Sequence, residues 1–281
     1  MCRLALTGQV LALQDGNDLL VPAAARGDGW VTDLYVMNPG ESTIHATVYW
    51  LTRGQPNPNP PLMGFTLLPG ETRVLADVIE SGFHLPHGEG AFRVVAKGGT
   101  IIVNSRIYRR NDGATYGQGF EGVPANMAIS AASDSPASTT HIVGLSNNSS
   151  YRSNFYALAG AQGATLKVSL RDVAGAVVAT KGYAPLGPYE PMLVGVEDLG
   201  AGVASFDNAT LQVTVSDGSA VVGASKIDRY LATGDPTTLE SWLECPQRPE
   251  APLLTAAGEH NGVVGDSLGF LGGVIMVLTE D

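Results

Sequence analysis

The chain has 281 residues, of which 16 are Lys or Arg and 27 are Asp or Glu, so its formal net charge is −11. Apolar residues make up 44% and charged residues 15%, which is enough for a packed core and too little charge for a disordered acidic segment. The acidic balance argues against nucleic acid as a partner, because binding to phosphates needs a basic surface. The 35 glycines and 17 prolines predict frequent turns and few long helices.

Cys2 and Cys245 are the only cysteines, too few for a disulfide framework or a four-thiolate metal site. The N-terminal apolar run is interrupted at Thr7, before it is long enough for a signal peptide. We therefore expect a cytoplasmic protein, or an extracytoplasmic one whose leader has been removed. The chain has no uninterrupted apolar run of about 18 residues, so we expect no membrane span.

Alternating apolar and polar residues, typical of strands with one buried face, dominate the chain. Strands are predicted at 32–37 and 44–50, joined by Asn38-Pro39-Gly40, whose proline and glycine favour a turn. The proline-rich run 55–61 predicts an exposed loop. On the two strands we expect the inward-facing side chains to be Leu34, Val36, Ala46, Val48 and Trp50.

Further strands are predicted at 64–68, 73–76, 91–96 and 100–108. Lys97-Gly98-Gly99 predicts a hairpin turn between the last two. Helix is expected only as single turns, at 76–81, 196–200 and 238–243.

The pattern of the first part of the chain recurs after residue 140. Four blocks correspond: Trp30–Tyr35 with Tyr151–Tyr156, Ala46–Tyr49 with Leu166–Ser169, Phe92–Gly99 with Leu211–Gly218, and Ser105–Ile107 with Ser225–Ile227. The offset stays between 119 and 121 over these blocks, which predicts an internal duplication.

This arrangement predicts an all-β fold of two tandem antiparallel β-sandwich domains, jelly-roll or immunoglobulin-like, with little helix. We expect an N-terminal strand or arm at 1–18, a first sandwich at 19–125, a linker at 126–140, a second sandwich at 141–240, and a proline-rich spacer with an apolar C-terminal strand at 241–281.

Four runs, Val21–Ala24, Thr32–Gly40, Leu68–Glu71 and Ile101–Tyr108, resemble an uncharacterised bacterial family of tandem β-sandwich repeats. The same order of motifs is similar, more distantly, to the sensory rhodopsin transducer family, a small oligomeric β-sandwich. The resemblance covers roughly residues 20 to 235. It implies a β-sandwich fold, export and a tendency to oligomerise and bind partners. Its motifs are turns and core strands, so it carries over no catalytic residue and no signalling role.

Gly265-Asp266-Ser267-Leu268 spells the opening motif of a lipase and esterase class with a serine nucleophile. That chemistry needs a histidine and a carboxylate beside the serine. In this class the histidine follows the motif, whereas here His260 precedes Ser267 and no histidine follows. We favour a turn of small residues, and a serine hydrolase using Ser267 is the third-ranked hypothesis.

The loop 84–89 offers two histidines and a glutamate, but Pro86 prevents a helix that would align them on a metal. We expect a solvated loop, no metal site and no cofactor. Arg26-Gly27-Asp28 spells the tripeptide that integrins recognise, and residues 15–18 gather oxygen ligands without the spacing of a calcium loop. We interpret both as polar turns.

The first domain presents outward-facing tyrosines and an arginine where the second has mostly solvating groups. Such side chains bury area while keeping a hydrogen-bonding tip, as surfaces for protein partners do. The candidate interaction face comprises Tyr35, Met37, Tyr49, Leu51, Asn104, Arg106 and Tyr108. Two alternatives stay open: the other domain or the chain's own oligomer covers this face, or a one-residue register slip exchanges the two faces.

The apolar run near the C-terminus falls outside both repeats and is strongly strand-like. An unpaired apolar strand is an aggregation hazard, so we expect it to pair with an edge of its own chain or of a neighbour. The candidate assembly strand is Val274, Ile275, Met276, Val277 and Leu278.

These features predict a non-catalytic structural or interaction protein. We expect it to self-associate as a homo-oligomer through sheet edges and the tyrosine-rich face, with a further protein or glycan partner open. The alternative is a carbohydrate- or cell-surface-binding module that stacks sugars on Tyr35, Tyr49 and Tyr108 beside Arg106.

Overall fold

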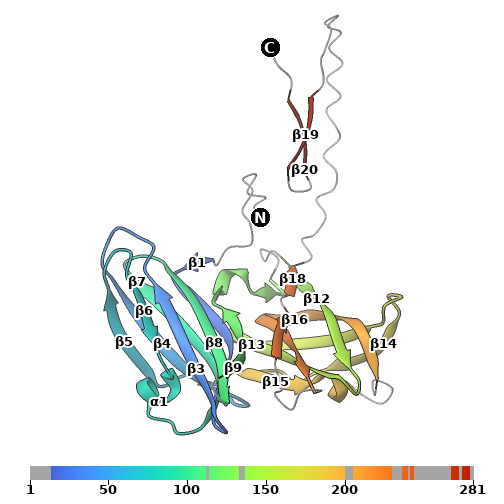
Figure 1. The fold of residues 1–281 in the computed structure, drawn as a ribbon, viewed down its shortest axis with the longest axis horizontal. Coiled ribbons are helices and arrows are strands. Elements are labelled where there is room, and N and C mark those ends of the chain that lie inside the picture. Colours follow the sequence, from blue (N-terminus) through green and yellow to red (C-terminus); the bar gives the residue numbers. More distant parts are fainter. Residues whose placement is uncertain are drawn as a thin grey trace, which may run out of the picture. The chain divides into compact units, whose positions relative to one another are not determined.

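The computed structural model describes residues 14–111, 114–132, 137–199, 205–229 and 236–239, and the backbone of strands at 241–243, 267–271 and 274–278. The chain divides into two compact units, one spanning residues 13–245 and the other combining residues 2–12 with 246–281. The described chain is mostly antiparallel β-structure (Figure 1), which confirms the predicted all-β class. No helix in the described part is both long and apolar enough to cross a membrane.

The first half of the larger unit contains two antiparallel sheets. Sheet A has the order β1 (Asp15–Gly16), β8 (Ile101–Asn111), β3 (Trp30–Met37) and β6 (Thr72–Leu75), with β9 (Ala114–Glu121) also paired to β8. Sheet B has the order β10 (Val123–Pro124), β2 (Asp18–Arg26), β7 (Gly88–Lys97), β4 (Ile44–Thr52) and β5 (Leu62–Leu67). The short helix α1 (Val78–Phe83) follows β6.

The core of the first half combines side chains of both sheets. The predicted inward-facing set is confirmed, because each member is at most 1% exposed: Leu34, Val36, Ala46, Val48 and Trp50. The Trp50 ring lies 5.4 Å from the ring of Phe92 on β7 and 6.3 Å from that of Phe83 on α1. Period-two alternation therefore identifies the buried face of β3 and β4 correctly.

Residues Lys97–Gly99 do not form a hairpin turn, contrary to the sequence prediction. β7 pairs with β2 and β4 in sheet B, whereas β8 pairs with β3 in sheet A, so the connection crosses from one sheet to the other. Gly98 adopts φ +99°, a conformation that L side chains rarely take. Gly98 correctly indicates a sharp change of chain direction. The alternating pattern of the two flanking strands does not indicate whether they pair with each other.

The second half is one eight-stranded sheet. Its main path is β14 (Val177–Gly182), β13 (Tyr151–Arg171), β16 (Phe206–Asp228), β12 (Thr139–Asn147) and β18 (Ser241–Leu243). Shorter strands flank this path: β11 (Ile129–Ser130) and β17 (Pro236–Leu239) pair with β16, and β15 (Pro191–Gly195) pairs with β13. Phe155 and Val168, near opposite ends of β13, share one core, so the long strands fold over on themselves.

Two of the three predicted helical turns are present, as α1 and as the 3-10 helix η2 (Val196–Leu199). The third, predicted at 238–243, is wrong. Residues 236–239 and 241–243 are strands, which pair with β16 and β12 respectively. Isolated from its neighbours, this stretch has no local feature that distinguishes a helical turn from a short edge strand.

The two halves have the same strand order. The ends of β13 occupy the places of β3 and β4, and the ends of β16 occupy the places of β8 and β7. The pairing register also repeats, because Val48 pairs with Val94 as Val168 pairs with Val213. An origin by duplication stays a prediction.

The register corrects one of the four aligned blocks. Leu34 pairs with Ser105 in the first half, and Phe155 pairs with Ala224 in the second. Ser105 therefore takes the place of Ala224 rather than of Ser225. Ser105 and Ser225 are the same residue type and both are buried, so the sequence does not reveal that this block is misaligned by one residue.

The outer face of sheet B packs against the outer face of the second half. The side chains of this contact form one buried apolar cluster, which we call the seam: Leu20, Leu51, Ala91, Ala128, Leu158 and Val221. Tyr49 and Tyr189 pack against it at partial burial. Arg93 lies over the Tyr189 ring at 4.7 Å and is ion-paired to Asp18 at 2.7 Å. This contact joins the halves through surfaces that a separate sandwich would expose.

A ring of three hydrogen bonds reinforces the seam. Gln118 Nε2 on β9 donates to Tyr156 Oη at 3.1 Å, and Ser225 Oγ donates to Gln118 Oε1 at 2.5 Å. Since the only Ser225 hydroxyl proton is used, Tyr156 Oη must donate to Ser225 Oγ, which closes the ring. Tyr156 is 3% exposed, and its ring meets that of Phe120 edge-on at 5.3 Å.

The loop before β5 adds backbone contacts between the halves. The Asn57 N–H donates to the Pro188 carbonyl at 2.8 Å, and Asn57 Nδ2 donates to the Tyr189 carbonyl at 3.0 Å. Asn57 is 5% exposed although it lies within the proline-rich run that was predicted to be an exposed loop. The amide side chain supplies the hydrogen bonds that the flanking prolines lack.

The segment 126–140, predicted as a linker, is anchored to the second half where the structure describes it. It includes most of the 3-10 helix η1 (Ala125–Met127) and strand β11. Ile129 is 2% exposed in the second core, and Ser130 Oγ donates to the Gly218 carbonyl at 2.9 Å.

In the smaller unit, β19 (Ser267–Leu271) pairs antiparallel with β20 (Val274–Leu278). The candidate assembly strand thus has a partner within its own chain. Its side chains, and the residues before Ser267 that include His260, lie outside the described residues. Its role in assembly stays a prediction, as does a hydrolase using Ser267.

Replacing Trp50 by alanine should lower the free energy of unfolding by about 3–5 kcal/mol, because it removes the largest side chain of the first core. Urea denaturation followed by circular dichroism measures this. Val143→Ala is the control, since Val143 on β12 is 63% exposed, and it should change stability by less than about 0.5 kcal/mol. Equal effects of the two substitutions would contradict the assigned core.

Tyr156→Phe should destabilise the protein by about 1–3 kcal/mol, because it removes the hydroxyl that bonds Gln118 and the buried Ser225. Chemical denaturation gives this value directly. A neutral substitution would show that the hydroxyl ring contributes nothing to holding the halves together.

Candidate interaction surface

The candidate interaction face is divided between two sheets. Tyr49 and Leu51 belong to β4 in sheet B, where Leu51 is fully buried in the seam and Tyr49 packs against it. The remaining five residues lie on β3 and β8 in sheet A: Tyr35, Met37, Asn104, Arg106 and Tyr108. The single face expected from the sequence needs this correction, and its physical reason is the sheet-crossing turn between β3 and β4.

Pairing register shows which side chains are neighbours on the outer face of sheet A. Tyr35 lies between Val74 on β6 and Asn104 on β8. Val74 is 54% exposed, and Tyr35 is half-buried beside it. This part of the face is therefore apolar and aromatic up to the open edge of the sheet.

Two arginines enclose Tyr108 at the far end of the same face. The guanidinium of Arg106 lies 4.8 Å from the ring centroid and that of Arg110 lies 5.6 Å from it. Tyr108 stands opposite Gly117 on β9, and a Cβ at Gly117 would come within 2.6 Å of Tyr108 Cβ. The missing side chain makes room for the tyrosine, which is only 6% exposed and so offers no free stacking surface for sugars.

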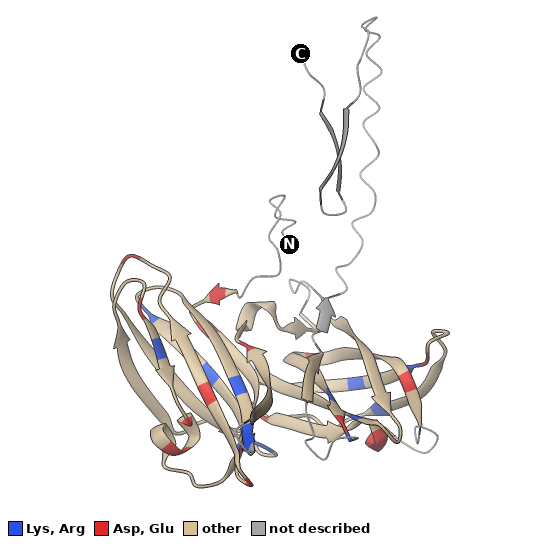
Figure 2. Ribbon diagram, in the orientation of Figure 1, with Lys and Arg blue, Asp and Glu red and all other residues tan. Residues whose placement is uncertain are grey.

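Figure 2 shows Lys and Arg interspersed with Asp and Glu along the strands of the first half. Four of its arginines are ion-paired, namely Arg26, Arg53, Arg73 and Arg93. Arg106 is exposed and instead donates to Thr115 Oγ1 at 3.0 Å. It is the cation of the predicted face that could meet an incoming carboxylate.

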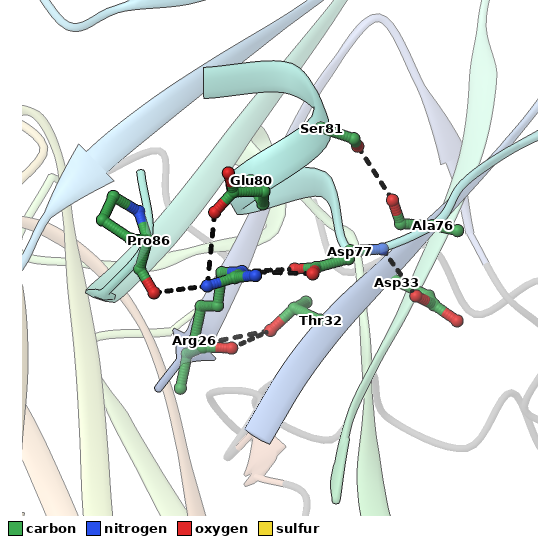
Figure 3. A network of polar contacts seen from close by, with 9 residues as sticks. Arg26, Thr32, Asp33, Ala76, Asp77, Glu80, Ser81 and Pro86 are labelled. Atoms are coloured by element: carbon green, nitrogen blue, oxygen red, sulfur yellow. Dashed lines mark hydrogen bonds and ion pairs between the residues drawn. The ribbon is translucent and has the colours of Figure 1, made fainter. Parts of the chain in front are cut away.

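Arg26 of the Arg-Gly-Asp tripeptide is part of a network that anchors α1 (Figure 3). Arg26 Nε donates to both oxygens of Asp77 at 2.9 and 3.1 Å, and Nη1 lies 3.3 Å from Glu80 Oε2. The Asp77 N–H in turn donates to Asp33 Oδ1 at 2.8 Å. The network ties the end of β2, β3 and the start of α1, so this arginine has a structural role and the polar-turn interpretation stands.

The loop with His84 and His87 follows α1. His84 caps the helix in a left-handed conformation, with its N–H donating to the Glu80 carbonyl at 2.9 Å. His87 packs beside Gly27, where an added Cβ would lie 3.0 Å from Nδ1. Within the described ranges, no three His, Cys, Asp or Glu side chains gather closely enough to hold a metal ion.

Six of the seven exposed large apolar side chains among the described residues lie on or beside strands at the ends of sheets, and the exception is Val143 on β12. In the first half these are Leu62 on β5, Leu68 just after it and Val74 on β6. In the second half they are Val177 and Val178 on β14, and Val173 in the turn before it. All three strands lie at the ends of their sheets. We call these two groups the edge patches.

Sequence reasoning missed Tyr156 and Gln118, which connect the halves. Tyr156 lies on the side of β13 that faces away from the second core, and its ring packs in the core of the first half. A signal was present, because Leu158 follows it at the next outward position of β13. Two large outward side chains on one strand indicate a covered face.

Comparisons with known proteins assign no family to this chain. No family model matches it, and no curated protein matches it. One solved structure is similar in part, the "Crystal Structure of Thermotoga maritima 1070". The match has a TM-score of 0.33 and 10% identity, over 38% of this chain and 93% of that chain.

The burial of Tyr183 in the second half makes the stability of the protein depend on pH in the alkaline range. Its hydroxyl is buried and has no hydrogen-bond partner in the described structure, and burial raises its pKa to about 12. The unfolded tyrosine ionises near pH 10. Its contribution to stability is therefore complete below pH 10 and is lost as the pH rises towards 12.

Tyr183→Phe should remove this alkaline loss and leave stability at neutral pH equal or higher, since no hydrogen bond is broken. Denaturation of both proteins between pH 9 and 12 measures the difference. The account of Tyr183 fails if the wild-type protein and the variant lose stability in parallel.

Proposed function

We propose that this chain is a non-catalytic interaction protein that self-associates by pairing of its sheet edges. The observation that carries the proposal is the position of the two edge patches. An edge strand presents unpaired N–H and C=O groups, and exposed apolar side chains on it favour pairing with another chain. Natural edges are usually protected by charged side chains, proline or a covering element.

The strands β5 and β14, which carry Leu62 of the first patch and Val178 of the second, occupy equivalent places in the two halves. β5 pairs with β4 as β14 pairs with the corresponding end of β13. Each chain therefore offers two similar edges. Pairing of like edges gives a closed dimer, whereas pairing of β5 with β14 gives a head-to-tail chain.

Sheet A ends in a further edge strand, β6, which carries Val74 of the first edge patch. Val74 on β6 lies directly beside Tyr35, and Met37 is paired with Thr72 on the same two strands. A neighbour seated on this edge would also cover the half-buried aromatic and apolar side chains of the face. Arg106 then lies at the rim, where a charge contributes more to orientation than to affinity.

The mass in solution over a range of concentrations tests the proposal. The wild-type chain should exceed the 29.2 kDa of one copy, and increasingly so at higher concentration. Leu62→Lys combined with Val178→Lys should return the mass to one copy, because lysine blocks edge pairing. The control is Val143→Lys, which places the same charge on β12, away from the sheet ends, at a side chain that is 63% exposed.

A wild-type protein of one-copy mass at every concentration would refute self-association. An oligomer that survives the double substitution would refute pairing through β5 and β14.

A further inference from the structure

A cleft with a volume of about 260 Å³ opens beside the seam. One wall comes from β2, β7 and β9 of the first half, and the other from β13 and β15 of the second. Neither half forms it alone. Ligand sites occur preferentially at such junctions, in concave spaces with an apolar lining and a few polar groups.

Small residues keep the floor of the cleft open. β2 is irregular between Val21 and Ala24, and the lining here is Pro22 followed by three alanines. Gly90 on β7 also lines the cleft, and a side chain is excluded there because a Cβ would lie 2.0 Å from the Leu51 carbonyl oxygen on the neighbouring strand. No long side chain of this stretch fills the space.

The hydrogen-bond ring lies at the side of the cleft and leaves one donor for it. Gln118 and Tyr156 both line the space. Gln118 uses one amide N–H towards Tyr156 and its carbonyl towards Ser225. The ring fixes the orientation of this amide, so its second N–H is held in place before any ligand arrives.

Planar polar side chains from both halves line the rest. On the second half, Arg152 is exposed and donates to Asn154 Oδ1 at 3.3 Å. On the first half, Arg53 is paired with Glu89, and their side chains are 39% and 54% exposed. These side chains include hydrogen-bond donors and acceptors, and they carry both positive and negative charges.

An aromatic ring completes the lining. Trp30 is partly buried and is held edge-on against Tyr116, with centroids 5.8 Å apart and planes at 87°. Met192 and Leu193 on β15 add apolar surface to the lining. A tryptophan held in this way offers an apolar surface at little cost in conformational entropy.

We propose that this cleft binds a saccharide of one or two sugar units. A sugar ring has apolar C–H faces that pack on an aromatic ring, and a rim of hydroxyls that donate and accept hydrogen bonds. Trp30 fits the first requirement, and Gln118, Asn154 and Arg152 fit the second. The two arginines would also donate hydrogen bonds to the carboxylate of a uronic acid, bidentately if it approaches in plane. This binding is distinct from self-association, because the edge patches contribute nothing to the cleft.

Saturation-transfer NMR of the full chain tests the proposal with glucose, galactose, N-acetylglucosamine and glucuronate as probes. At least one sugar should receive saturation, with its ring C–H protons strongest. Arg152→Ala should weaken that binding about tenfold or more, since it removes a charged hydrogen-bond donor. Arg171→Ala is the matched control, because Arg171 is on the same strand and bonds Gln212 instead.

Absence of transfer to all four sugars would overturn the proposal, as would equal binding by the wild type and Arg152→Ala. A preference for glucuronate alone would assign an acidic sugar to the two arginines. Retention of sugar binding in Leu62→Lys/Val178→Lys would separate this site from the oligomer, and its loss there would overturn the independence of the two.

Discussion

The packing of Leu20 and Leu51 against Leu158 and Val221 is the contact on which the rest of the structure depends. Each of these side chains points away from the core of its own half. Without the seam, both halves would expose apolar surface on a sheet face, which a soluble domain rarely tolerates over a large area. The seam makes one compact unit of two halves that share a strand order.

The seam also determines which surfaces remain available. It covers the sheet B part of the tyrosine-rich face, and it leaves the outer face of sheet A and the edge patches open. The cleft exists for the same reason, since it is lined by strands of both halves that the seam holds together. Tyr156 on β13 lines this cleft. Its aromatic side chain packs in the core of the first half, and its hydroxyl hydrogen-bonds Ser225 of the second half.

Much of the fold could be predicted from the sequence, because alternation reports burial directly. Leu34 and Trp50 were assigned inward by periodicity alone, and they are buried. The correspondence between Val48 and Val168 was found by register, and both have a valine partner across the ladder. Alternation and spacing are properties of a single segment, so they can be recognised without knowing which strands pair with it.

Pairing between distant strands could not be predicted in the same way. Strands joined by Lys97–Gly99 look alike whether they form a hairpin or cross between sheets, and only the hydrogen-bond partners distinguish the two. The division of the predicted face follows from this, since Tyr35 and Tyr49 are on successive strands of different sheets. The cleft was equally inaccessible, because Arg53 and Arg152 are brought together only by the seam.

Native-state hydrogen exchange of Leu158→Ala tests the seam most directly. This substitution removes a side chain of the second half only. If the two halves unfold as one unit, amide protection should fall in β4 of the first half together with β13. A loss of protection confined to the second half, with β4 unchanged, would show that the halves are independent and would contradict the account.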